Sequence, residues 1–388
     1  MANSKKLFEL LRVALCEEKL DEYIKTETTM ETLAELFKLA KKHDLAHIVG
    51  DVLDKNGLLP ENSQARKAFL QERNMAIFRY EQINYEYNEV LRVLNEKGIK
   101  HIPLKGSVIR AFYPEPCLRT SCDIDILVHE YDIEQCKSVL AQELAYEYSG
   151  ECSHDVQFFS PSGVHLELHF TLLEDYLGKS TVELLNGVWS YATPIEKDSK
   201  TFALTNEMFY FYHIAHMAKH FQTGGCGIKP FMDIFIMETS MQTDNAKRDE
   251  LLKRGGLLAF ADRARELANV WFASASHTET TELLEEFVLV GGVYGTMQNK
   301  VVTQQAQRGG KFRYTLSRIF QPYDQIKCAY PVLEKHKWLT PFYQVVRWFR
   351  ILFKGRAGMS IRELNTNANV SKDTQDQPQI LLKDLGLM

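Results

Sequence analysis

Two aspartates separated by one residue, Asp123 and Asp125, are the strongest chemical feature of the sequence. They belong to the segment Asp-Ile-Asp-Ile-Leu-Val, whose apolar residues predict a strand. Because side chains alternate between the faces of a strand, both carboxylates should project to one side. Adjacent carboxylates resist joint ionisation unless a cation bridges them, and Mg²⁺ prefers such oxygen ligands. The pair therefore predicts a magnesium site, the alternative being two solvated aspartates at the end of an edge strand.

A third carboxylate, Glu167, is expected beside this pair. Every second residue of segment 164–170 is apolar, which predicts a strand with Glu167 on its polar face between His165 and His169. If this strand belongs to a hairpin next to the aspartates, Glu167 reaches them and serves as the third acid of a two-metal site. Two alternatives stay open: a zinc or iron site formed by the histidines and Glu167, or a solvated polar face.

The turn that precedes the aspartates has groups suited to binding a phosphate. A short predicted strand, Lys-His-Ile-Pro-Leu, leads through Lys105 into Gly106 and Ser107, which begin a helix. A helix N-terminus presents unpaired N–H groups and the positive end of a dipole, and glycine allows the backbone to approach a ligand closely. An ordinary strand-to-helix turn capped by Ser107 would look the same, so the motif gains weight from the aspartates that follow.

A later helix, capped by Thr205, places His213, His216 and His220 on one face. A single histidine is usually structural, but three on one face, followed by a glycine-rich turn, favour the wall of a cleft. Zinc binding by His216 and His220, which are four residues apart, is the minority alternative.

Together these motifs resemble the nucleotidyltransferase superfamily related to DNA polymerase beta, and within it the branch called nucleotidyltransferase family 5. The similar residues, in order, are Leu104-Lys105-Gly106-Ser107, Arg119, Asp123-Ile-Asp125 and Glu167-Leu-His169. The resemblance implies that an acceptor hydroxyl attacks the α-phosphate of a nucleoside triphosphate and releases pyrophosphate. It also implies that Asp123 and Asp125 hold two Mg²⁺ ions about 4 Å apart, with Mn²⁺ as a substitute, and that Glu167 binds the acceptor-side ion.

The resemblance further implies which residues contact the nucleotide. These are Lys105, Gly106, Ser107, Arg119, His216 and His220. Gly106 and Ser107 would hold the outgoing phosphates, and Lys105 and Arg119 would neutralise their charge. Asp233 is expected to orient a helix or a basic side chain. ATP is the expected donor, and the acceptor, a small molecule or a protein hydroxyl, is left open.

The surrounding sequence divides into four parts. Residues 1–98 have helical periodicity, 99–175 alternate strands and helices as the catalytic core, and 176–360 are mostly helical. Residues 361–388 are polar and predicted as a flexible tail, although the final segment could dock on the body. The expected fold is α+β, with a polymerase-beta-like core and a mixed sheet flanked by N- and C-terminal helical regions.

Composition narrows the possible partners and compartment. A net charge of −5 gives no general field for a polyanion, so nucleic acid is not an expected partner. Seven scattered cysteines without a Cys-x-x-Cys pair are typical of reduced thiols. No apolar run reaches the roughly 20 residues of a transmembrane helix, and the N-terminus lacks the features of a signal peptide, so the expected compartment is the cytoplasm.

Other classes compete with a catalytic nucleotidyltransferase. One is a binding module on the same fold that does not turn over, and the presence of all three acids argues against it. A kinase-type phosphotransferase would require Walker or protein-kinase motifs, which the sequence lacks. Finally, segment 341–356 combines aromatics with Arg347, Arg350, Lys354 and Arg356 and could lie on a membrane surface. A helix packed in the core with a wet basic edge is the preferred interpretation.

Overall fold

The computed structural model describes residues 2–172, 178–293, 295–330, 332–353, 357–369 and 380–387. The N-terminal part is helical, as predicted: α1 (Ala2–Cys16), α2 (Glu22–Thr26), α3 (Met30–Lys42), α4 (Ala46–Lys55) and α5 (Gln64–Glu96). Gly98 follows α5 with a φ of 74°, so it provides the expected left-handed end of the long helix.

A mixed five-stranded sheet lies next in the chain, which confirms the predicted α+β fold. Its segment contains β1 (His101–Pro103), α6 (Gly106–Ile109), η1 (Arg110–Phe112), η2 (Pro116–Leu118), β2 (Asp123–Val128), η3 (Glu130–Asp132), α7 (Ile133–Leu144), β3 (Glu147–Glu151), β4 (Asp155–Phe159) and β5 (His165–His169). The strand order is β1-β2-β5-β4-β3. Strands β2 and β5 are parallel, whereas the other neighbours are antiparallel.

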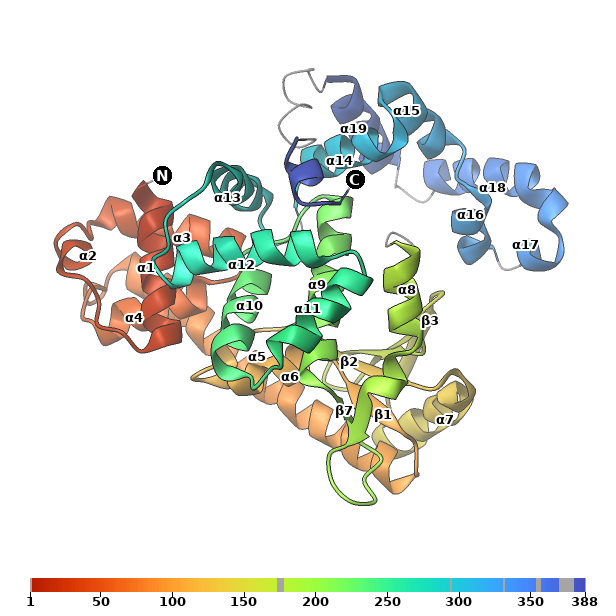
Figure 1. The fold of residues 1–388 in the computed structure, drawn as a ribbon, viewed down its shortest axis with the longest axis horizontal. Coiled ribbons are helices and arrows are strands. Elements are labelled where there is room, and N and C mark those ends of the chain that lie inside the picture. Colours follow the sequence, from red (N-terminus) through yellow and green to blue (C-terminus); the bar gives the residue numbers. More distant parts are fainter. Residues whose placement is uncertain are drawn as a thin grey trace.

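The two faces of this sheet have different roles. Ile124, Ile126 and Val128 of β2 join a buried apolar cluster with residues of α5 and α7, so these helices cover one face. Because side chains alternate, Asp123 and Asp125 project to the opposite face. That face is turned toward the helical body that follows (Figure 1).

The helical body continues with α8 (Lys179–Asn186), η4 (Val188–Tyr191), β6 (Ala192–Pro194), β7 (Phe202–Leu204), α9 (Asn206–Thr223), α10 (Lys229–Ser240), α11 (Asn245–Arg254), α12 (Leu258–Phe272) and α13 (Glu279–Gly291). Apolar residues of α1, α3 and α4 share one large core with those of α9, α10 and α12. The N-terminal and C-terminal helical regions therefore pack as one body around the sheet.

The remaining helices form a group that stands apart from this body in Figure 1, and we call it the distal lobe. It contains α14 (Met297–Arg308), α15 (Lys311–Ile319), α16 (Tyr323–Ala329), α17 (Val332–Lys335), η5 (Lys337–Leu339), α18 (Thr340–Phe353) and α19 (Ala357–Asn369). Helix α14 packs against α9, and its small apolar core consists of Val301, Val302 and Tyr314. None of the helices in the described part of the chain is long and apolar enough to cross a membrane.

The end of the chain differs from the flexible tail expected for 361–388. Helix α19 extends to Asn369, and residues 370–379 lie outside the described residues. Beyond them, Leu381, Leu382, Leu385 and Leu387 are buried in the large core. Their apolar spacing allows this segment to dock, which the sequence offered only as an alternative.

Candidate active site

The register of the sheet brings the predicted acids together. Asp123 pairs with His165, and Asp125 pairs with Glu167 on the adjacent parallel strand β5. Directly opposite residues on neighbouring strands have Cβ atoms about 5 Å apart. The hairpin partner of β5 is β4, so Glu167 reaches the aspartates by parallel pairing of β5 with β2. We call Asp123, Asp125 and Glu167 the acidic cluster.

Asp125 is the buried centre of this cluster, and cations already contact it. Its Oδ1 accepts hydrogen bonds from Lys105 Nζ at 2.7 Å and from His169 Nε2 at 2.8 Å. His169 Nε2 also lies 3.5 Å from a Glu167 carboxylate oxygen. Burial opposes ionisation of Asp125, but Lys105 and His169 outweigh it and lower its pKa. Asp125 is therefore ionised at neutral pH.

Asp123 has the opposite electrostatic character. Burial and the neighbouring Asp125 charge raise its pKa to about 6. The pKa of Glu167, by contrast, is lowered, first by its hydrogen bond with His169. Three carboxylates share one region with Lys105 and His169, so the site carries an excess of negative charge that a cation would relieve.

The donor set of this cluster fits a divalent cation. Two groups of three residues have ligand atoms within 4.8 Å of one another: Asp123, His165 and Glu167, and Asp125, Glu167 and His169. Glu167 belongs to both groups, so its carboxylate is within reach of the ligand atoms of either one. Carboxylate oxygens suit Mg²⁺, and an added imidazole is compatible with Mn²⁺.

The zinc alternative requires His165, Glu167 and His169 to bind one ion. In a strand the four-residue separation of the histidines spans roughly 13 Å, too far for two ligands of a single metal. Among the described residues, each histidine instead groups with a different aspartate. The geometry therefore argues against this alternative.

The turn between β1 and α6 reaches the site through its backbone and Lys105. Lys105 has a φ of 46°, which is uncommon for a residue with a side chain, and Gly106 follows it into α6. Both residues line the cavity described below. Ser107 does not line it, and its hydroxyl oxygen is buried without a hydrogen-bond partner among the described residues. Its predicted contact with phosphate remains a prediction.

Arg110 supports this turn, a role that no motif in the sequence predicts. Its Nε donates to the Gly106 carbonyl at 2.8 Å, and its Nη2 donates to Ser121 Oγ at 2.6 Å. Ser121 lies two residues before the first residue of the aspartate strand, and its Cβ lies 3.2 Å from where a side chain on Gly106 would begin. Arg110 therefore holds the turn predicted to bind phosphate against the segment that leads into the acidic cluster.

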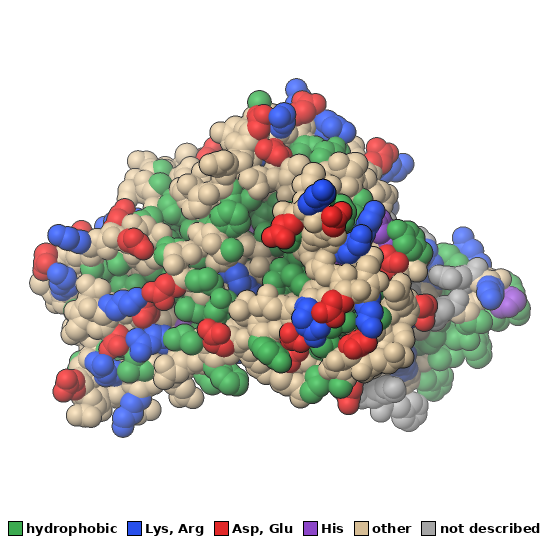
Figure 2. All heavy atoms as spheres, turned by 90° about the horizontal axis from the view of Figure 1, so that it is seen from below, with side chains coloured by type: hydrophobic (Ala, Val, Ile, Leu, Met, Phe, Trp, Pro, Cys, Tyr) green, Lys and Arg blue, Asp and Glu red, His purple; other side chains and the backbone are tan. Residues whose placement is uncertain are grey.

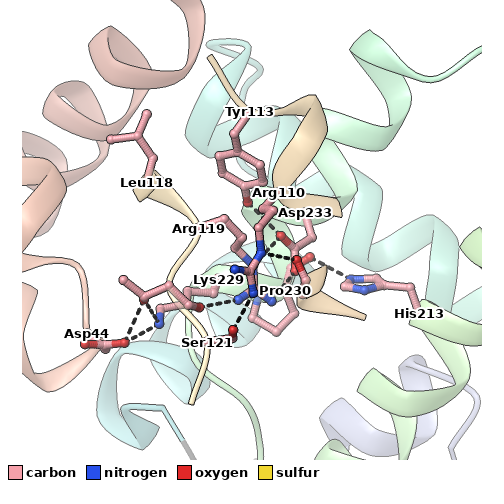
Figure 3. Close-up of polar contacts among 12 residues, drawn as sticks. Asp44, Arg110, Tyr113, Leu118, Arg119, Ser121, His213, Lys229, Pro230 and Asp233 are labelled. Carbon is pink, nitrogen blue, oxygen red and sulfur yellow. Dashed lines mark hydrogen bonds and ion pairs between the residues drawn. The ribbon is translucent and has the colours of Figure 1, made fainter. Parts of the chain in front are cut away.

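Arg119 and Asp233 form a second charged group, drawn in Figure 3. Arg119 donates from Nε and Nη2 to the two Asp233 oxygens at 2.7 and 2.8 Å, and Tyr113 Oη donates to Asp233 at 2.7 Å. Arg119 Nη1 donates to the Thr120 carbonyl. This bidentate pair confirms that Asp233 orients a basic side chain. It also means that Arg119 is already engaged through all three of its guanidinium nitrogens.

Lys229 extends this group toward the N-terminal helices (Figure 3). Its ammonium pairs with Asp44 and donates to Thr120 Oγ1 at 2.6 Å, while Thr120 Oγ1 donates to Asp44 at 3.0 Å. We call Asp44, Arg119, Lys229 and Asp233 the buried clamp. The clamp joins the loop after α3, the segment before β2 and helix α10.

The predicted histidine face lies on α9. His216 and His220 have their Nε2 atoms 3.0 Å apart, whereas His213 Nε2 contacts the Pro230 carbonyl at 3.0 Å. Burial, followed by the charge of Lys105, lowers the pKa of His216 well below its usual value. No group of three metal-binding side chains in the described part of the chain includes these histidines.

A single cavity of about 450 Å³ connects these features. Its lining includes the acidic cluster, Lys105, Gly106, Arg119, His216 and His220, together with Thr120, Ser121, His154, Gln157, Tyr212, Lys219 and Lys229. The sheet forms one wall and α9 with the start of α10 forms the other. A pocket of this size suits a small-molecule substrate. Lys219 was expected near this cleft beside the histidine face, whereas the other six of these residues were missed because they carry no motif of their own.

The α+β fold, with acids on parallel neighbours in a mixed sheet, is that of a nucleotidyltransferase. The model of a family described as "uncharacterised nucleotidyltransferase" matches residues 30–273, well over half of the 388 residues, and the chain belongs to this family. The match begins at α3 and ends just after α12, so it includes the sheet, the acidic cluster and the buried clamp. Comparisons with curated proteins and with solved structures gave no match.

Proposed function

We propose that the protein is a metal-dependent nucleotidyltransferase that moves a nucleoside monophosphate from a nucleoside triphosphate, with ATP the expected donor. The acceptor would be a hydroxyl of a small molecule or protein in the cytoplasm. The observation that carries this proposal is the register that sets Glu167 opposite Asp125, beside Asp123. Family membership supports nucleotidyl transfer as the general reaction.

The acidic cluster would hold Mg²⁺, or Mn²⁺ in its place, through Asp123, Asp125 and Glu167. When bound, the metal would supply positive charge that polarises the α-phosphate and lowers the pKa of the acceptor hydroxyl. The chain's own residues tune this site. Lys105 and His169 keep Asp125 ionised, and the lowered pKa of Glu167 keeps Glu167 ionised as well, which is the form that could accept the hydroxyl proton.

The nucleotide would bind across the cavity between the sheet and α9. Gly106 offers a backbone that a phosphate can approach, and Lys105 offers the nearest positive charge, with Ser107 a more distant candidate. Arg119 would contribute charge from the wall, since Asp233 fixes its guanidinium. His216 and His220 would face the base, the sugar or the acceptor from the opposite wall.

The reaction itself would be a displacement at phosphorus. The acceptor oxygen forms a bond to the α-phosphorus, the bond from that phosphorus to the β-phosphate oxygen breaks, and pyrophosphate leaves. The proton of the acceptor passes to Glu167 or to water. Such catalysis depends mainly on positioning and electrostatic stabilisation, which is what a preorganised set of charges on a rigid sheet supplies.

One observation favours the alternative, a nucleotide- or partner-binding module without turnover. Lys105 and His169 already neutralise Asp125, so part of the site is balanced without a metal. The remaining charge on Asp123 and Glu167 nevertheless gives the site an excess of negative charge. We therefore prefer catalysis and treat the binding module as an outcome of the test.

Pyrophosphate release tests the proposal. The purified chain would be incubated with each of the four nucleoside triphosphates, Mg²⁺ or Mn²⁺, and a cell-extract metabolite pool, with mass spectrometry to find the modified acceptor. We expect Asp123→Asn to reduce release by roughly a thousandfold, about 4 kcal/mol of transition-state stabilisation. Asp198→Asn is the matched control, because Asp198 is exposed and outside the cavity. If the wild type, Asp123→Asn and Asp198→Asn all bind nucleotide but none releases pyrophosphate, the protein is a binding module.

A further inference from the structure

The distal lobe exposes apolar side chains in a regular pattern. On α15, Phe312, Leu316 and Ile319 are exposed, with Phe312 at 80%. Their spacing of four and three residues places them on one face of the helix. An exposed stripe of this kind marks a surface that binds something, because isolated proteins rarely leave contiguous apolar area in water.

Helix α18 repeats this pattern. Its apolar residues face outward and a polar residue is buried, the opposite of the usual arrangement in a helix on a protein surface. Phe342, Val345 and Phe349 form its exposed stripe, with Phe342 at 61% and Phe349 at 54%. Gln344, by contrast, is only 6% exposed, and its amide exchanges hydrogen bonds with the backbone of Gln321. The sequence favoured an α18 packed in the core, so its outward apolar face is a correction. Of the basic residues in that prediction, Lys354 and Arg356 lie outside the described residues.

The exposed aromatics continue between the two helices. Trp338 and Phe320 are both exposed, and Lys335, His336 and Lys337 precede Trp338 on the surface. Figure 2 shows hydrophobic side chains gathered at the end of the molecule that α16 to α18 form. Aromatic rings beside lysines are typical of surfaces that enter the interface between water and lipid.

Charge separates the lobe from the rest of the chain. Residues 297–353 contain ten Lys and Arg against two Asp and Glu, a formal net charge of +8 in a chain whose total is −5. The remainder of the chain therefore carries −13. Arg313, Lys335, Lys337 and Arg350 are exposed, so this charge is available to a partner. A partner of this surface should be anionic.

We propose that the distal lobe docks on the surface of an anionic lipid bilayer, with the stripes of α15 and α18 in the headgroup region and the lysines and arginines on lipid phosphates. A second copy of the chain would bring like charges together. Nucleic acid would use the aromatic rings for stacking, but aliphatic Leu316, Ile319 and Val345 suit acyl chains instead. The docking is peripheral and does not depend on the proposed catalytic function.

The test is sedimentation of the full chain with lipid vesicles. Vesicles of phosphatidylcholine alone are compared with vesicles that also contain phosphatidylglycerol, at low and high salt. We expect binding to be stronger to the anionic vesicles and weakened by salt. The double variant Phe342→Ser/Phe349→Ser should bind at least about tenfold more weakly, because two rings no longer enter the bilayer.

The matched control is Phe78→Ser, because Phe78 is 62% exposed but lies on α5, far along the chain from the lobe. It should bind like the wild type, and circular dichroism should show that every variant is folded. Lys335→Gln/Lys337→Gln should weaken binding at low salt. Three results would overturn the proposal: no preference for anionic vesicles, unchanged binding of the phenylalanine double variant, or stripe-dependent self-association or RNA binding without lipid binding.

Discussion

The acidic cluster and the buried clamp line the same cavity, yet their charges are balanced differently. In the clamp, Arg119 and Lys229 face Asp233 and Asp44, so two positive charges meet two negative ones. In the acidic cluster, three carboxylates meet one lysine, with His169 as the further donor. The charges of the clamp are balanced within the protein, whereas the acidic cluster keeps an excess of negative charge that a bound cation would balance.

This difference indicates which charges are balanced within the protein and which are left in excess for a ligand. Burial and repulsion from Asp125 raise the pKa of Asp123 to about 6. Asp233 is also buried, but its ion pair with Arg119 lowers its pKa. A buried aspartate with its full set of donors is structural. A buried aspartate beside another carboxylate stores unfavourable energy that a bound cation releases.

The largest expected effect on stability comes from breaking the clamp at its centre. Asp233→Ala leaves the Arg119 guanidinium in the cavity wall without its carboxylate. We expect the free energy of unfolding to fall by about 3 to 5 kcal/mol, as is usual when one partner of a buried ion pair is removed. Urea or thermal unfolding followed by circular dichroism would measure the loss.

A double variant shows whether this loss comes from the unpaired charge. Replacing both partners, as Arg119→Met/Asp233→Leu, removes the charge and should recover much of the stability lost in Asp233→Ala. If the double variant is less stable than Asp233→Ala, the destabilisation of Asp233→Ala comes from lost packing and not from an unpaired charge. Charge balance would then not explain the difference between the buried clamp and the acidic cluster.

A smaller effect is expected at the outer end of the clamp. Lys229→Met removes the ammonium that links Asp44 and Thr120, and Asp44 can turn toward solvent because its side chain is partly exposed. The free energy of unfolding should fall by about 1 to 2 kcal/mol. Lys247→Met is the matched control, since Lys247 is an exposed partner of Asp244, and it should change stability by less than about 0.5 kcal/mol. Equal effects of the two substitutions would contradict a linking role for Lys229.

The smallest effect concerns pH in metal-free solution. The pKa of Asp123 is raised from its ordinary value of 3.8 to about 6, so the folded state holds this proton more tightly than the unfolded state. Its contribution to stability is present below about pH 4 and is lost as pH rises through about 6. Asp123→Asn should remove this loss. A shift of about two pKa units corresponds to at most about 3 kcal/mol. Because Asp123 is partly exposed, solvent screening reduces this figure, and Asp123→Asn should be about 1 kcal/mol more stable than the wild type at pH 7. If the free energy of unfolding depends on pH in the same way in the wild type and in Asp123→Asn, the raised pKa of Asp123 is contradicted.

The parts of the site that follow from local sequence could be predicted. The alternation in Asp-Ile-Asp-Ile-Leu-Val gives a strand with both aspartates on one face, and Gly98 and Gly106 mark the ends of neighbouring elements. Glu167 could be placed on the polar face of its strand by the same alternation. What the sequence did not give is that this strand pairs in parallel with the aspartate strand, because strand partners are chosen by tertiary packing.

The clamp and the distal lobe depend on contacts that are distant in sequence. Arg119 and Asp233 are separated by 114 residues, and no local pattern identifies one as the partner of the other. Lys229 has no motif, and its pairing with Asp44 spans 185 residues. The outward face of α18 could not be predicted either, because an amphipathic pattern does not tell which side is covered by the rest of the protein.

The central claim is that the acidic cluster is a cation site, and metal-dependent stability tests it most directly. Thermal unfolding of the wild type and Asp123→Asn would be measured at pH 7 with chelator, with Mg²⁺ and with Mn²⁺. A bound cation should raise the wild-type midpoint progressively as its concentration exceeds the Kd, and should leave Asp123→Asn, in which the repulsion is already relieved, almost unchanged. Equal shifts in both proteins, or none in either, would contradict a metal site at Asp123, Asp125 and Glu167.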